Sequence, residues 1–120
     1  MTKQLSFMKS MHEILPHFRR RLNNAESTED VKKFFTYTIM ELFEKIFPDQ
    51  NLLTYEDIDL LPGNVPPYTL SDRIINRYEV SQALETSDLK DILHKLAETA
   101  SKRYIHLEKN PEKTESKIRL

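Results

Sequence analysis

Two pairs of carboxylates have the spacing that a metal site on helices requires. Glu41 and Glu44 are three residues apart, and so are Glu56 and Asp59. Residues at this spacing share one face of a helix, so each pair can direct two carboxylates at one divalent cation. The pairs predict a magnesium site if the fold brings all four side chains together at a cleft.

The two pairs resemble the ExxE and ExxD pairs of the all-α nucleoside triphosphate pyrophosphohydrolases. The resemblance covers positions 41–59, and the stretch between the pairs is slightly shorter than is usual in that family. It implies a magnesium-dependent nucleotide pyrophosphohydrolase-like enzyme, which is the enzymatic alternative for this chain. Under the opposite hypothesis, Glu41 and Glu44 lie on the solvated strip of a largely buried helix and hold no metal.

Basic side chains are concentrated near the start of the sequence. Residues 1–24 contain five basic residues and one acidic residue, whereas residues 25–62 contain nine acidic and three basic ones. The run Arg19-Arg20-Arg21 can contact phosphate oxygens. A weak nucleic-acid-binding or regulatory protein that uses its basic first helix is therefore a further alternative. Three consecutive residues point in three directions around a helix, however, so this run alone forms no coherent patch.

The other reactive residue types do not form a catalytic pattern. His12 and His17 are five residues apart with Pro16 between them, whereas a zinc-binding helix needs histidines four apart. The chain has no cysteine, and its one glycine, Gly63, excludes a Gly-rich phosphate loop and argues against a β-rich fold. We therefore expect no cofactor and favour a non-enzymatic function.

An unusually apolar segment points to interaction instead. Between Val31 and Phe47, ten of seventeen residues are apolar or aromatic. At 100° per residue, nine of the ten fall within an arc of roughly 240°, far wider than the face of an ordinary surface helix. Several neighbours must therefore cover this helix, from its own chain or from another.

The preferred hypothesis is a helical interaction or assembly module that self-associates through apolar helix faces. Its partner is then a second copy, most simply in a symmetric homodimer, or another helical protein. Residues at the margins of the wide arc are the first candidates for the interface: Phe34, Met40, Phe43 and Phe47. Met8, Met11, Tyr68 and the 62–68 loop are secondary candidates.

The pattern of the whole chain predicts an all-α fold, a compact bundle of four main helices. The first helix carries its apolar stripe from Phe7 to Leu22 and is kinked, or divided in two, at Pro16. The second begins at Ser27 or Thr28 and ends at Pro48. The third begins after Ser71 and runs to about Glu85, and the fourth runs from Ser87 to Asn110-Pro111.

A long Pro-rich connection, residues 48–69, separates the second and third helices. Thr54 can cap a short helix there, Tyr55 to Leu61, and Pro62-Gly63-Asn64 predicts a turn. Long connections in a compact domain are often functional, so we expect a binding feature in this one.

The domain organisation is expected to be simple. We predict one helical domain, residues 1–110, followed by a flexible charged tail, residues 111–120. No run of 18 apolar residues occurs, so no membrane partner is expected. The lack of cysteine is compatible with a cytoplasmic location.

Overall fold

The computed structural model describes residues 6–48 and 50–109 of the chain, and most of these are helical. The three long helices are α1 (Met8–Asn24), α2 (Thr28–Ile46) and α5 (Leu89–Lys109); α3 (Asp72–Ile75) and α4 (Tyr78–Thr86) are shorter. A 3₁₀ turn, η1 (Tyr55–Asp57), leads into strand β1 (Ile58–Leu60), which pairs antiparallel with β2 (Tyr68–Leu70). The mostly helical class is confirmed, and the small sheet is an addition that the sequence pattern did not predict.

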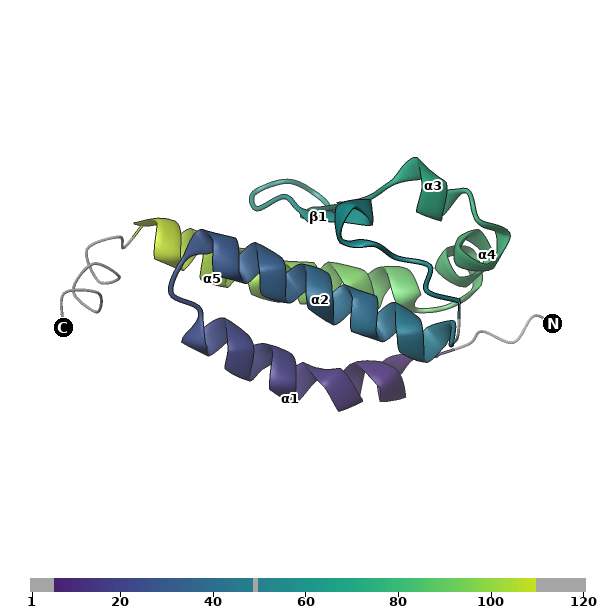
Figure 1. Ribbon diagram of the computed structural model, residues 1–120, viewed down its shortest axis with the longest axis horizontal. Helices are drawn as coiled ribbons and strands as arrows, with labels where there is room; N and C mark the ends of the chain where they lie inside the picture. The colour runs from purple at the N-terminus through teal and green to yellow at the C-terminus, as the bar shows by residue number, and fades with distance from the viewer. Residues whose placement is uncertain (1–5, 49, 110–120) are drawn as a thin grey trace.

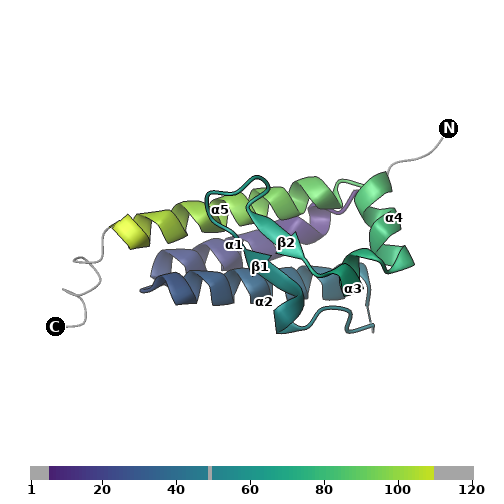
Figure 2. The ribbon, with the colours of Figure 1, turned by 90° about the horizontal axis from the view of Figure 1, so that it is seen from above.

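The long helices lie side by side, and the hairpin covers one face of them. Helix α1 packs against both α2 and α5 (Figure 1). The β1–β2 hairpin lies on the opposite side of the α2–α5 pair, and α4 crosses the end of the molecule where α5 begins (Figure 2).

The predicted charged tail, residues 111–120, lies outside the residues that the structure describes. No helix in the described part of the chain is long and apolar enough to cross a membrane.

Helix α1 is held at both ends by α5 and the turn before it. At its start, the Phe7 N–H donates to a carboxylate oxygen of Asp88 at 2.8 Å, and the Ser6 hydroxyl donates to the other oxygen at 2.8 Å. At its end, the Arg103 guanidinium donates to the carbonyls of Asn23 and Ala25 at 3.3 and 3.1 Å. An acid at the N-terminus and a base at the C-terminus both complement the helix dipole. Helix α1 continues through Pro16 as one helix rather than two; its kink remains a prediction.

Helix α2 is covered on several sides by its own chain. It packs against α1, α5 and β1, and seven of its residues are buried. The Ser27 side chain caps it by accepting from the Asp30 N–H at 3.1 Å, as the sequence predicts. The wide apolar arc therefore reflects a central position within the fold.

The predicted short helix from Tyr55 to Leu61 is wrong. After one 3₁₀ turn the chain becomes a strand in which Ile58 and Leu60 are buried and Asp59 is exposed. This alternation has the period of a strand rather than a helix. The return strand β2 has the same pattern, with Thr69 exposed between two buried residues.

The loop of the hairpin contains the predicted turn. The Asn64 N–H donates to the Leu61 carbonyl at 3.1 Å, and Gly63 has φ of 87°. This positive φ at the third position is what a type II turn requires and glycine adopts without strain. The rest of the loop returns through Pro66 and Pro67 to β2.

The predicted third helix is divided. Helix α3 ends at Ile75, and Arg77 is extended before α4 begins. Ile74 and Val80 are both fully buried, although six residues of straight helix would place them about 120° apart around the axis. The break at Asn76 and Arg77 lets both side chains enter one core.

Candidate functional site

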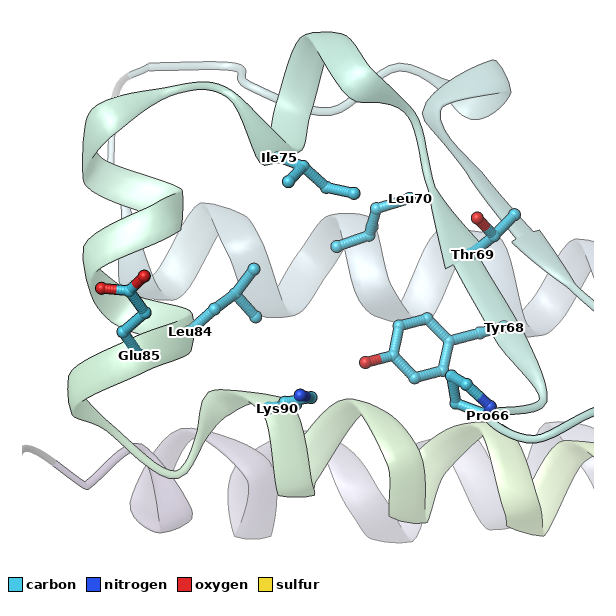
Figure 3. Close-up of a pocket in the computed structure, with 8 residues that line it drawn as sticks. All are labelled: Pro66, Tyr68, Thr69, Leu70, Ile75, Leu84, Glu85 and Lys90. Carbon is cyan, nitrogen blue, oxygen red and sulfur yellow. The ribbon is translucent and has the colours of Figure 1, made fainter.

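An open apolar pocket lies between the hairpin and the short helices. It has a volume of about 310 Å³, and we call it the β2–α4 pocket. Residues from five segments line it: Pro66, Tyr68, Thr69, Leu70, Ile75, Leu84, Glu85 and Lys90. Figure 3 shows Tyr68 and Leu70 of β2 on one side of it and Leu84 of α4 on the other. The size is at the lower end of the range for ligand pockets.

The side chains that line this pocket are mainly apolar, and the pocket is open to solvent beside Ile75. Tyr68 and Leu70 are buried, Leu84 is half-buried, and Ile75 is 41% exposed. Burial and the carboxylate of Asp91 raise the pKa of the Tyr68 hydroxyl, so it stays protonated and available as a donor. Lys90 and Glu85, both exposed, add one charge of each sign. The arrangement suits an apolar group with a polar edge.

A buried carboxylate fixes the backbone on which this pocket is built. Asp57 is 6% exposed and lies where η1 meets β1. One of its oxygens accepts from the Thr54 N–H and hydroxyl at 2.8 and 2.9 Å, and the other accepts from the Ser71 hydroxyl at 2.7 Å. The Arg73 guanidinium donates to both oxygens and, at 2.9 Å, to the Leu52 carbonyl. These bonds tie the connection, β2 and α3 together.

The electrostatic state of Asp57 follows from these partners. Burial alone raises the pKa of its carboxyl, but the hydrogen bonds from Arg73, Thr54 and Ser71 outweigh burial and hold the pKa well below its usual range. Thr54 is the N-cap residue of η1 and forms a capping box with Asp57, so the predicted cap is present, although the element that it caps is a single 3₁₀ turn. Asp57 is a structural carboxylate whose role sequence reasoning missed.

The predicted interaction residues are distributed between the core and the surface. Phe43 is 2% exposed, Met11 6% and Tyr68 9%, so these three side chains pack within the chain itself. The half-buried members pack at the margin of the core: Met8, Phe34, Met40 and Phe47. An interface that uses this set must therefore use the half-buried members, with Tyr68 contributing only at the wall of its pocket.

Within the described residues, the four carboxylates of the predicted magnesium site are not gathered into a group that could hold a metal ion. Glu56 and Asp59 line one shallow hollow of about 420 Å³, but Glu41 and Glu44 do not line it. Within residues 6–48 and 50–109, no three or more histidine and acidic side chains come close enough to hold a metal ion. The physical reason is local, because Asp59 lies on a strand rather than a helix and faces Lys32, 4.0 Å from its ammonium group.

The basic run also disperses, as its spacing suggests. Arg19 and Arg20 are exposed, whereas Arg21 is half-buried. The Arg21 guanidinium carbon lies 6.0 Å from the centre of the Phe34 ring, within the range of a cation–π contact. Arg21 is thus drawn toward α2 instead of standing with its two neighbours.

Most of the pocket residues were missed because they come from distant segments. Of the residues that line this pocket, only Tyr68 and the residues of the 62–68 loop were named as interaction candidates from the sequence. The alternation of Ile58 and Leu60, repeated by Tyr68 and Leu70 beyond a Pro-Gly turn, was the available signal for a hairpin. No local pattern marks Leu84 or Lys90.

Comparisons of this chain with protein families, with characterised proteins and with solved structures found no match.

Proposed function

We propose that this chain is a non-enzymatic interaction module that receives an apolar group of a partner in the β2–α4 pocket. The observation that carries the proposal is the pocket itself: about 310 Å³ of space, walled by Tyr68, Leu70 and Leu84 and open beside Ile75. It lies at the end of the long connection, where a functional feature is most expected. The hydrogen bonds that Asp57 accepts from Ser71 and Arg73 support it, because they fix the junction between β2 and α3.

An uncharged fluorescent apolar dye, Nile red, tests the pocket directly. We expect its emission to rise with the wild-type chain and to lose most of that rise in Ile75→Arg, which places a charged side chain at the open wall. The matched control is Val65→Arg, because Val65 is 92% exposed and does not line this pocket. Equal emission from both variants, with unchanged circular dichroism, would overturn the proposal.

A second candidate function is self-association, in which the partner is another copy of this chain. The half-buried Met40 and Phe47 support it, since Phe47 directly follows the end of α2 and lies seven residues, about two helical turns, after Met40. The expected assembly is a symmetric dimer of the helical bundle.

Light scattering over a hundredfold range of concentration tests self-association. We expect a dimer that Phe47→Asp splits and that Glu41→Lys leaves intact, because Glu41 is on the exposed strip of the same helix. A monomer at every concentration would remove this candidate and leave the pocket proposal standing.

A further inference from the structure

Within the residues that the structure describes, one edge of strand β2 has no partner strand. In the two-stranded sheet, Ile58 pairs with Leu70, Asp59 with Thr69 and Leu60 with Tyr68. The Leu61 N–H donates to the Pro67 carbonyl at 2.8 Å, and the Ser71 N–H donates to the Asp57 carbonyl at 2.7 Å.

The direction of the β2 backbone groups follows from these two bonds. Hydrogen-bonded and non-hydrogen-bonded pairs alternate along an antiparallel ladder. The bonds at 61–67 and 57–71 make Asp59–Thr69 the hydrogen-bonded pair between them. The N–H and C=O groups of Tyr68 and Leu70 therefore point away from β1, and no hydrogen bond reaches them within the described part of the chain.

The free edge and the β2–α4 pocket adjoin each other. Tyr68, Thr69 and Leu70 all line the pocket, so the outward backbone groups and the apolar wall belong to one site (Figure 3). Unpaired strand groups beside a side-chain pocket are the two requirements for strand addition, in which main-chain bonds give affinity and the pocket gives specificity.

The size of the pocket limits what can enter it, and the unpaired edge of β2 is what favours an extended backbone. One turn of an α-helix, about 10–12 Å across and 5.4 Å long, fills roughly 400–600 Å³. The pocket holds about 310 Å³, too little for a helical turn but enough for one large apolar side chain. An extended backbone can lie along β2 while such a side chain enters.

The rim of the pocket has no excess of positive or negative charge. Glu85 and Lys90 have opposite signs, and Thr69, the exposed residue of β2, is neutral. Because the two charges cancel, the rim gives a strongly basic or acidic segment no net attraction, and a neutral segment is compatible with it.

We propose that an extended, uncharged segment of a partner protein adds as a third strand to the free edge of β2 and places one large apolar side chain in the β2–α4 pocket. This inference rests on the proposed function and names its partner class.

Synthetic peptides test strand addition. The probes are blocked heptapeptides that alternate Thr with Val and have Leu, Phe or Met at the centre. We expect binding to slow amide hydrogen exchange at Tyr68 and Leu70 by about tenfold. Exchange at Thr69, whose N–H already faces Asp59, should not change. Binding should depend little on salt and be lost in Ile75→Arg but not in Val65→Arg.

N-methylated versions of the same peptides are the matched controls. Methylating the alternate amides that face β2 should abolish binding, whereas methylating the other set should leave it intact. Equal binding of both sets would overturn strand addition, as would the absence of binding by all three peptides.

Two further outcomes separate this inference from the proposed function. If the dye enters the pocket but no peptide binds, the strand-addition proposal fails and the interaction module stands. If Tyr68 and Leu70 become protected in the protein alone as its concentration rises, the occupant is a second copy, which also overturns the proposal.

Discussion

Asp57 concentrates more hydrogen bonds than any other side chain named above. Three residues donate to its carboxylate, from the connection, from the end of β2 and from α3. A buried carboxylate is stable only when such donors replace the water that it has lost. Replacing the Asp57 carboxylate by an amide leaves the Arg73 and Ser71 donors facing an uncharged group.

We therefore expect Asp57→Asn to lower the free energy of unfolding by about 2–3 kcal/mol. Urea denaturation measures the loss. The matched control is Asp59→Asn two residues away, whose side chain is 56% exposed and pairs with Lys32 at 4.0 Å. It should cost less than about 0.5 kcal/mol. Similar losses in both variants would contradict the structural role of Asp57.

The lowered pKa of Asp57 predicts how stability depends on pH. In the unfolded chain this carboxyl takes up its proton near pH 3.8, whereas in the folded chain it does so only at much lower pH. The unfolded state therefore binds more protons in that interval, and stability falls as pH falls. The contribution is complete above about pH 5 and is lost progressively below about pH 4.

Comparing wild type with Asp57→Asn isolates this contribution. The difference in free energy of unfolding should be constant between pH 7 and 5 and should shrink between pH 4 and 2. The other carboxylates titrate in both proteins, so their effects cancel in the difference. A difference that stays constant to pH 2 would show that the carboxyl titrates alike in both states.

At the scale of elements, the start of α1 and the start of α2 are capped in different ways. Ser27 caps α2 from the adjacent position in the chain, a local signal that the sequence shows. Asp88 satisfies the start of α1 from 81 residues away. Both contacts satisfy backbone N–H groups near a helix start.

We expect Ser27→Ala and Asp88→Ala each to cost about 1 kcal/mol in urea denaturation. Their local effects should differ. Amide exchange should accelerate in the first turn of α2 for Ser27→Ala, and in the first turn of α1 for Asp88→Ala. Acceleration in α1 with no change in α5 would confirm that Asp88 acts as the cap of another helix.

The elements that sequence reasoning placed correctly have strong local signals. The ends of α2 follow from Ser27 and Pro48, and α5 follows from one continuous apolar face from Leu89 to Leu107. Segment 55–61 was misassigned because it is too short for a helical period to be distinguished from a strand. The break in segment 72–85 was missed because no Gly or Pro marks it in the sequence. Their conformations depend on what they pack against.

At the scale of the molecule, the position of α2 between α1, α5 and β1 explains its composition. Phe43 was expected at an interface, yet it is 2% exposed and lies in the core. Phe47, whose ring centre is 5.6 Å from that of Phe43, is half-buried at the margin. The wide apolar arc did not distinguish coverage by its own chain from coverage by a partner.

These two phenylalanines give a prediction about the whole fold. Phe43→Ala should lower the free energy of unfolding by about 3–5 kcal/mol, because it removes a fully packed ring and leaves a cavity. Phe47→Ala should cost about 1–2 kcal/mol, because its ring has only part of its area to lose. Urea denaturation of dilute protein measures both, and equal losses would contradict the placement of Phe43 in the core.

The sequence by itself determined the helical class, the three long helices and the Ser27 cap of α2, because periodicity and local capping act over a few neighbouring residues. Only the tertiary structure decided which apolar residues the chain buries, where the carboxylates face and where a pocket opens. Asp59 lies on a strand, so the helical spacing that would pair it with Glu56 does not apply. The β2–α4 pocket joins Tyr68, Ile75 and Leu84 from three separate elements. Such contacts depend on how elements pack, and packing depends on shape and burial across the whole chain rather than on local spacing.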